Sequence, residues 1–548
     1  MTRSERLTII ATILGSTVVF LDATVVNVAL PAIAEDLDTG LADQQWVVEA
    51  YLLALVSLML VGGALADQFG RKRMYVLGLI GFGITSAACA VAPNSEALIV
   101  SRAAQGFAGA LLVPGSLAIL AHTFEGAARG KAVGTWTAWT GIATVIGPAG
   151  GGALIEAISW RAIFWVNLPL IVGTILLTLH SVEESRDPEA DRAIDWLGIG
   201  LSAFGLGGPV YGLIQQPAHG WGDPMVYVPI VGGLLLFGAF LLWESRYRHA
   251  MLDLSLFRIR NFWVTNLETL IVYAGLIGAF FFVALFLQQT LGYSPLEAGL
   301  ATTPVSVVMF ILSPWFGRVS SSTGPRIPMA VGPIAGGIGL LMLIRLDSGS
   351  AYLTDFLPAM IVFGLGLSAT VAPLTATALN SVEERRAGVA SGINNGVSRV
   401  AGLLAIAILG AVIAGSFTSS VDDEIAGASL SPKASRAVAD AREKSLASAD
   451  TSGLPDDEAT FVGNSVTDAS ERAFHIGMAL AGGLMIVGGV IAGIGIVNPR
   501  EPVESEPENV PRAASAGECG RTSGPASPGP VPGTLAPEPV GAPMDTAL

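Results

Sequence analysis

The sequence predicts an all-α, polytopic membrane protein that crosses the membrane about fourteen times. Three observations support this: 52% of its 548 residues are hydrophobic, only 13% are charged, and apolar stretches of spanning length recur along most of the chain. Soluble globular proteins carry about 25% charged residues, and a helix needs roughly 20 apolar residues to cross the hydrocarbon core of a bilayer. The composition therefore excludes an ordinary soluble domain as the main body of the protein.

The apolar stretches define the expected helices in chain order. They cover residues 7–30, 46–66, 74–92, 97–120, 133–155, 162–180, 194–214, 226–243, 262–288, 298–316, 327–346, 353–375, 388–415 and 475–497. The first stretch follows Arg3 and Arg6 and is similar to a signal peptide with a cleavage pattern at 32–34. That pattern lies about a dozen residues beyond the apolar core, which is too far for cleavage. We therefore interpret 7–30 as the first spanning helix.

Basic residues gather in alternate short loops, which indicates the orientation of the chain. The loops on this face contain Arg71, Lys72, Arg73, Arg129, Lys131, Arg246, Arg248, Arg258, Arg260, Arg318, Arg326, Arg385 and Arg386. The opposite short loops contain little beyond Arg161 and Arg345. By the positive-inside rule the basic face is cytoplasmic. We expect a multi-pass protein of the plasma membrane with both termini in the cytoplasm.

Two longer segments interrupt the series of apolar stretches. Residues 416–472, rich in Ala, Ser and Asp, are expected to form an external loop with one surface helix near 432–449. Residues 498–548 have too few apolar side chains to offset the entropy lost on ordering, so we expect a disordered cytoplasmic tail. The acidic residues behind the formal net charge of -15 are concentrated in these two segments. The charge therefore does not indicate nucleic acid binding.

Four ionisable side chains inside the expected spanning helices are the candidates for function: Asp22, Glu49, Arg102 and Glu268. A charge at the centre of such a helix costs about 2.5–3.5 kcal/mol on insertion scales, so each needs a partner or a function. For Asp22 the structural alternative is a hydrogen bond between helices. Glu49 and Arg102 lie near the outer ends of their helices, where they could instead reach water or the membrane surface. Glu268 lies about one turn inside its helix and faces either a cavity or the cytoplasmic interface.

The fifth stretch is unusually rich in glycine. Gly147, Pro148, Gly151 and Gly152 lie within it. In a membrane, glycine permits close packing of helices, and proline introduces a bend. This stretch is expected to form a contact surface on which parts of the protein move, with ordinary packing as the alternative.

A weak internal repeat relates the loops at 63–71 and 317–326. Each pairs two glycines seven residues apart with a following arginine, and Ser321 stands where Asp67 stands in the first copy. The two halves of the chain are therefore expected to be related in shape, with an acidic conformational switch in the first half only. The residues of this switch are Gly63, Asp67, Gly70 and Arg71.

Several classes of chemistry find no support in the sequence. It contains no Walker phosphate-binding loop, so we expect energy from an ion gradient rather than from ATP. It contains no cluster of histidine and cysteine for a metal, and no serine elbow or paired carboxylates for hydrolysis. Cys89 and Cys519 indicate no disulfide framework. We expect no metal, no cofactor and no enzymatic activity.

Five segments in order resemble the motifs of the major facilitator superfamily, and specifically of its fourteen-helix drug:proton antiporter family. They are residues 21–31, 63–73, 102–106, 147–152 and 160–169. The resemblance implies a major facilitator fold, with six-helix bundles at 7–180 and 262–497 and two inserted helices in the linker 181–261. Gln68 stands where this family often has a basic residue, and Glu49 where it often has a small polar one.

The resemblance also implies a function. It predicts a proton-coupled antiporter that exports amphiphilic, often cationic, drugs, with the small-molecule substrate, protons and membrane lipid as its partners. Asp22 is the expected proton carrier, Arg102 sets its charge, and Glu268 is the reserve candidate. Burial disfavours the charged form of a carboxylate and a nearby arginine favours it, so movement of Arg102 would load and unload a proton.

Two alternatives to drug export stay open at this stage. The same fold could export one dedicated natural product, lipid or siderophore. From a different class, the chain could be a transport-inactive membrane receptor or scaffold, whose working parts would be the segment 416–472 and the tail.

Overall fold

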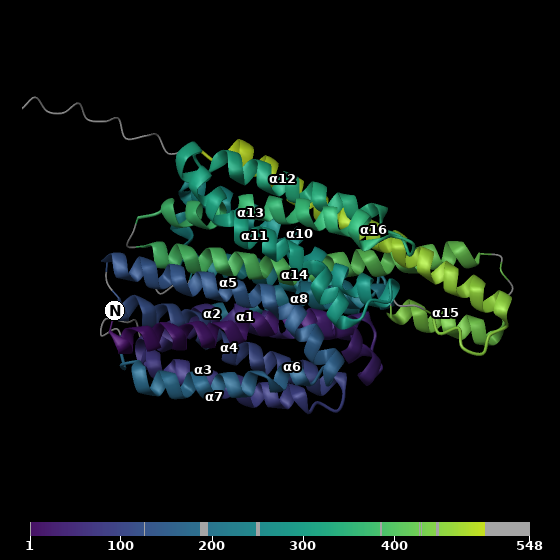
Figure 1. Ribbon diagram of the computed structural model, residues 1–548, viewed down its shortest axis with the longest axis horizontal. Coiled ribbons are helices and arrows are strands. Elements are labelled where there is room, and N and C mark those ends of the chain that lie inside the picture. Colours follow the sequence, from purple (N-terminus) through teal and green to yellow (C-terminus); the bar gives the residue numbers. More distant parts are fainter. Residues whose placement is uncertain are drawn as a thin grey trace, which may run out of the picture. The chain divides into compact units, whose positions relative to one another are not determined.

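A computed structural model describes residues 2–498, apart from residues 125, 187–194, 248–251, 384–385, 427, 429, 445 and 447–448. In this part of the chain all regular structure is helical (Figure 1). Residues 499–548, which include nearly all of the expected disordered tail, lie outside the described residues. The side chains of Arg129 and Lys131 and the whole of Arg385 do so as well.

The helices follow the order of the apolar stretches. They are α1 (Arg3–Leu37), α2 (Leu41–Phe69), α3 (Arg71–Ala90), α4 (Ser95–Thr123), α5 (Gly126–Ala157), α6 (Ala162–Trp165), α7 (Asn167–Ser181), α8 (Trp196–His219), α9 (Pro224–Glu244), η1 (Leu254–Arg258), α10 (Arg260–Leu285), η2 (Phe286–Thr290), α11 (Pro295–Thr323), α12 (Arg326–Met342), η3 (Leu343–Arg345), η4 (Tyr352–Phe356), α13 (Leu357–Asn380), α14 (Ala387–Ile425), α15 (Pro432–Lys444) and α16 (Asp456–Gly495).

Twelve of the described helices are long and apolar enough to cross a membrane, or thirteen when the bent α2 counts as one span. The 32-residue α5 packs against α1 and α11 and completes a set of fourteen long helices within the described residues. Each of the fourteen expected stretches overlaps one of these helices. The prediction of an all-α membrane protein is therefore confirmed.

Local sequence signals set several helix ends. At the start of α1, the Thr2 hydroxyl accepts a hydrogen bond from the Glu5 N–H, and the Glu5 carboxylate accepts one from the Thr2 N–H. Ser294 and Glu297 form the same reciprocal cap at the start of α11, where Pro295 occupies the first turn. Such caps satisfy backbone N–H groups that have no partner within the helix. They fix the beginnings of two helices that line the junction described below.

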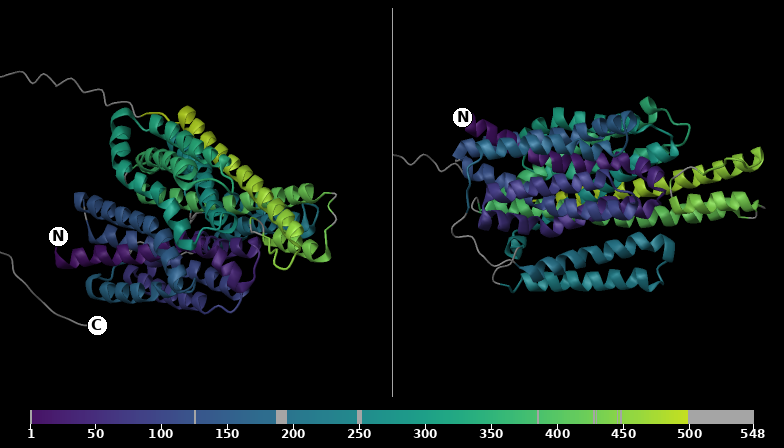
Figure 2. Two further views of the ribbon diagram at one scale, coloured as in Figure 1. Left: turned by 45° about the vertical axis from the view of Figure 1, so that its right-hand side comes forward. Right: turned by 90° about the horizontal axis from the view of Figure 1, so that it is seen from below.

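The helices pack in two groups, α1–α7 and α10–α16 (Figure 1). In the first group α4 packs on α2 and α3, and α1 packs on α5 and α7. In the second, α12 packs on α13 and α16, and α10 packs on α14 and α16. The inserted α8 and α9 pack on each other beside the bundle, and α8 also contacts α2 and α14 (Figure 2). The groups meet where α5 contacts α11 and α2 contacts α14. This arrangement of two groups with two inserted helices is the fold that the resemblance implies.

More of the segment 416–472 is helical than expected. The helices α14 and α16 run into it from both sides and extend past the other helices, with α15 beside them (Figure 1). Val421, Val438 and Val466, one from each helix, are fully buried in a common apolar cluster. The segment is polar on average, and this average composition predicted a loop because it does not show the few apolar positions that are buried.

Candidate functional site

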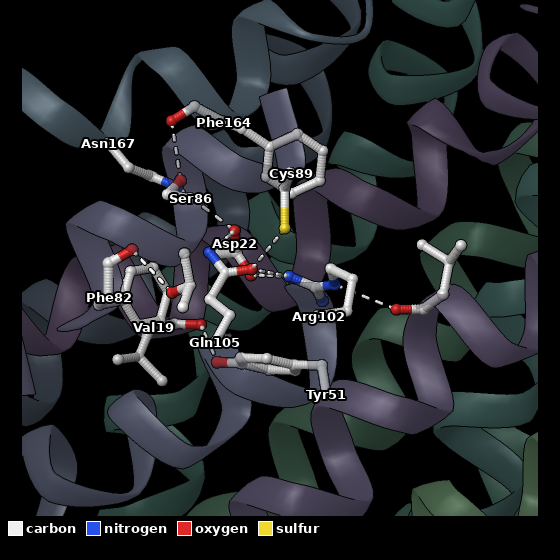
Figure 3. A network of polar contacts seen from close by, with 12 residues as sticks. Val19, Asp22, Tyr51, Phe82, Ser86, Cys89, Arg102, Gln105, Phe164 and Asn167 are labelled. Carbon is white, nitrogen blue, oxygen red and sulfur yellow. Dashed lines mark hydrogen bonds and ion pairs between the residues drawn. The ribbon is translucent and has the colours of Figure 1, made fainter. Parts of the chain in front are cut away.

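Asp22 on α1 and Arg102 on α4 form an ion pair inside the first group of helices (Figure 3). The guanidinium Nη1 lies 2.5 Å from the carboxylate Oδ2, and both side chains are 1% exposed. Arg102 is therefore not an anchor at the membrane surface, which was the alternative that the sequence left open. Two charges buried this deeply are stable only when they are paired and hydrogen-bonded.

Neighbouring polar groups complete the surroundings of this pair (Figure 3). The side-chain amides of Gln105 and Asn167 donate to Asp22 Oδ1 at 3.1 and 3.3 Å. Arg102 also donates to Gln105 Oε1 at 2.7 Å, and its guanidinium carbon lies 4.2 Å from the centre of the Tyr51 ring. The network joins α1, α2, α4 and α7. A change of charge at Asp22 therefore acts on four helices.

No role was predicted for Gln105 or Asn167, although both lie in segments that resemble family motifs. Gln105 follows Arg102 by three residues, so both side chains lie on one face of α4, and this spacing could have identified it. Asn167 carries no comparable signal. It also donates to Ser86 Oγ on α3 at 3.1 Å, and only the packing of α7 against α1 and α3 brings it to Asp22.

Glu49 and Glu268 lie outside this network. Both side chains are fully buried, and neither carboxyl group has a hydrogen-bond partner among the described residues. Glu49 lies one turn after Gln45, whose amide donates to the Ile406 carbonyl of α14 at 3.0 Å. It therefore faces the junction of the two groups, and the alternative in which it reaches water is wrong. Glu268 lies on α10 inside the second group and has no contact with the Asp22 pair.

Two carboxylates hold the loop between α2 and α3. Asp67 pairs with Arg71 at 2.7 Å. Glu184, which follows α7, accepts hydrogen bonds of 3.1 Å from the backbone N–H groups of the two residues after Arg71, where the helix dipole favours a negative charge. Gly70 has φ +110°, and a Cβ there would lie 2.7 Å from Glu184 Oε1, so only glycine fits. At Gly63 a Cβ would meet no atom closer than 3.7 Å.

The corresponding loop of the second half has the same build without the two carboxylates. Gly324 has φ +82°, and Asn498 Oδ1 accepts a hydrogen bond of 3.1 Å from the Arg326 backbone N–H. Asn498 thus takes the place that Glu184 has in the first half. The two loops are alike in shape and differ in charge, as the sequence repeat indicates.

Two glycines of α5 pack inside the first group. A Cβ on Gly147 would lie 2.4 Å from Thr24 Oγ1, and one on Gly151 would lie 2.5 Å from Val25 Cγ1. Both contacts are with α1, two and three residues beyond Asp22. Movement of α1 therefore acts directly on α5.

A further pair of glycines forms the contact between the two groups. A Cβ on Gly152 of α5 would lie 2.4 Å from the Pro295 carbonyl oxygen of α11. Reciprocally, a Cβ on Gly299 of α11 would lie 2.4 Å from the Pro148 carbonyl oxygen of α5. Backbones can approach this closely only because neither glycine has a side chain. The contact holds the two groups together at one end of the junction.

Replacement of Asp67 by Asn is expected to slow transport several-fold and to leave substrate affinity unchanged. The Asp67 side chain is 37% exposed, so loss of its pair with Arg71 costs at most about 1 kcal/mol of stability. Dye binding to purified protein and transport by the same protein in vesicles would be compared, with Asp67→Glu as the charge-preserving control. Transport equal to wild type at equal expression would contradict a switch role.

A bundle of spanning helices with an ion pair in its interior, built from two groups with related loops, is typical of gradient-driven membrane transport proteins. The comparisons with known proteins agree with this class. The chain belongs to the Major Facilitator Superfamily, whose family model matches residues 12–406.

Several characterised relatives resemble the chain over most of its length. It is 31% identical over 514 residues to the tetracenomycin C resistance and export protein of Streptomyces glaucescens, covering 93% of this chain and 94% of that protein. It is 35% identical over 426 residues to the multidrug resistance protein Stp of Mycobacterium tuberculosis, covering 78% and 79%. It is 31% identical over 482 residues to the multidrug efflux pump LfrA of Mycolicibacterium smegmatis, covering 86% and 93%.

Solved structures extend the comparison to the fold. The crystal structure of a bacterial homologue of the human lysosomal transporter Spinster matches with a TM-score of 0.59 at 17% identity, covering 91% of this chain and 100% of that one. At this identity the likeness concerns the fold alone.

Proposed function

We propose that this protein exports amphiphilic, drug-like small molecules across the plasma membrane in exchange for protons, with both termini in the cytoplasm. The observation that carries the proposal is the fully buried Asp22–Arg102 pair between two helices of membrane-spanning length. Such pairs in membrane helices mark ion and proton pathways. The names of the relatives, which are exporters and drug resistance proteins, support the substrate class.

Protonation of Asp22 is the proposed driving step. A proton on the carboxylate removes the charge that holds Arg102, and the four helices of the network lose their strongest mutual contact. Because Thr24 and Val25 of α1 rest on Gly147 and Gly151 of α5, a shift of α1 moves α5. The same turns of α5 carry the contact with α11, through Pro148 and Gly152. Proton binding at Asp22 would thereby change how the two groups meet.

In this mechanism the proton and the substrate bind at different places in the protein. A cationic substrate that competed with the proton at Asp22 would have to reach the carboxylate itself. The carboxylate is 1% exposed and already engaged by Arg102, Gln105 and Asn167. The substrate therefore affects the protonation of Asp22 by shifting the helices that surround it, and it does not contact the carboxylate directly.

A second candidate function is export of one dedicated natural product. The names of two relatives favour it, the tetracenomycin C resistance and export protein and the probable actinorhodin transporter of Streptomyces coelicolor. A broad substrate range in the assay below would exclude this candidate, whereas transport of one compound class alone would support it.

The test uses the purified full chain in sealed vesicles that contain a pH-sensitive dye. Ethidium and a series of aromatic antibiotics would be added under an imposed pH gradient. We expect movement of protons that depends on substrate, and accumulation of substrate that a protonophore abolishes. Absence of both with every compound would contradict the proposal and favour the receptor or scaffold alternative.

A further inference from the structure

Arg399 on α14 is a cation without an anionic partner. It lies twelve residues after the start of the helix, which is about 18 Å along its axis. No ion pair of Arg399 occurs in the described part of the chain. Arg102, by contrast, has Asp22 at 2.5 Å. A guanidinium does not lose its charge, so the partly buried Arg399 offers a positive charge that an anion can approach.

The guanidinium of Arg399 reaches from the second group of helices to the first. Its central carbon lies 5.6 Å from the ring centre of Phe20 on α1. The Phe20 ring stands edge-on to Trp136 of α5, with ring centres 6.3 Å apart. An aromatic surface of one group thus faces a cation of the other. Both Phe20 and Arg399 are only partly buried, so further atoms can approach them.

A polar stripe on α14 leads to Arg399. Ser391, Asn395 and Arg399 follow one another at intervals of four residues and lie on one face of the helix. Asn395 is exposed although it lies in a candidate membrane span. Polar side chains in membrane helices face the bundle interior or a water-filled cavity rather than lipid. This face of α14 is therefore a polar path that runs from the start of the helix toward Arg399.

The carboxylates of the interior do not neutralise Arg399. Asp22 is paired with Arg102. Glu49 is fully buried at the junction and makes no hydrogen bond or ion pair among the described residues. The accessible charge between the two groups is therefore positive.

We infer that Arg399 and Phe20 form a substrate subsite for an acidic group carried on an aromatic molecule, either a carboxylate or a phenolate. The guanidinium presents paired N–H donors that match the two oxygens of a carboxylate, and the adjacent ring offers an apolar surface for stacking. A cationic amphiphile would meet like charge at the same place. The inference rests on the proposed transport function and narrows its substrate class toward acidic or zwitterionic aromatic compounds.

The test compares rhodamine B with its ethyl ester, two dyes that differ in one carboxylate. Fluorescence anisotropy would measure binding of each dye to the detergent-solubilised full chain. We expect the wild type to bind the acid more tightly than the ester. Arg399→Gln should weaken binding of the acid about tenfold or more, as expected for loss of a charge-assisted hydrogen bond, and should not weaken binding of the cationic ester, which loses a like charge.

Matched variants separate a charge effect from damage to the fold. Arg399→Lys should keep most of the preference for the acid, and Arg345→Gln, which removes an arginine elsewhere in the chain, should keep all of it. If Arg399→Gln does not fold, Arg399→Met gives the same comparison with an unbranched apolar side chain. Equal binding of the two dyes by the wild type, or equal loss of both in the Arg399 variants, would overturn the inference.

The two proposals fail independently of each other. Binding in detergent needs no gradient, so a protein that prefers the acid and moves no protons would contradict the proposed transport and keep the subsite. Proton-coupled transport without any preference for the acid would contradict the subsite alone.

Discussion

Asp22→Asn is expected to abolish proton-driven accumulation of substrate and to lower stability. The amide can keep its hydrogen bonds with Gln105 and Asn167, but it cannot carry the exchanged proton and it leaves Arg102 without a counter-charge. Removing one partner of a buried ion pair costs about 3–5 kcal/mol. The 1% exposure of both side chains is the reason that this cost applies here.

A double variant distinguishes the two effects. Asp22→Asn combined with Arg102→Gln removes both charges, and should recover much of the thermal stability without restoring coupling. Asp22→Glu keeps the titratable group and should retain part of the transport with a shifted pH dependence. Substrate efflux and proton release would be measured together in vesicles from about pH 6 to 8, the range near neutrality in which a proton carrier must titrate.

Two other results would contradict the assignment of Asp22 as the proton carrier. If Asp22→Asn retains wild-type coupling, the proton is carried elsewhere, and the fully buried Glu268 and Glu49 become the candidates. If the double variant restores coupling along with stability, the pair is structural.

Gly152→Leu is expected to abolish transport by separating α5 from α11. Any side chain at this position would enter the space of the Pro295 carbonyl, 2.4 Å from the new Cβ. Overpacking costs about 1–3 kcal/mol. Because the contact joins the two groups, this energy acts on the equilibrium between conformations and shifts it about 5–150-fold away from the described state. Distances between spin labels on α5 and α11 would detect the shift.

The same helix provides a matched control for this prediction. Gly134 of α5 has no atom within 4 Å of the position of a Cβ, so Gly134→Leu should transport normally. Gly147→Leu and Gly151→Leu would overpack α1 instead, and should reduce activity without the same opening between α5 and α11. Normal coupled export by Gly152→Leu would reduce this contact to ordinary packing.

Much of the site was readable from residue types and their positions. Asp22 and Arg102 stand out because a charge in an apolar stretch is costly, and that cost depends only on the local sequence. Gly70 and Gly152 could be predicted as site residues because they lie in segments that resemble motifs of the family. Arg399 is also a charge in an apolar stretch, at 388–415, and no role was predicted for it.

The sequence by itself determined the class of fold and the order of the helices, because the length and hydrophobicity of a segment decide whether it spans a membrane, and both are local properties. Only the tertiary structure decided which groups meet. Asp22 and Arg102 are 80 residues apart, Asp22 and Asn167 are 145 apart, and Glu184 reaches the start of α3 across more than 110 residues. The same holds for the division of the α5 glycines between α1 and α11, and for the approach of Arg399 to Phe20. Each depends on the rotation and approach of whole helices, which many weak packing contacts set together and no short segment encodes.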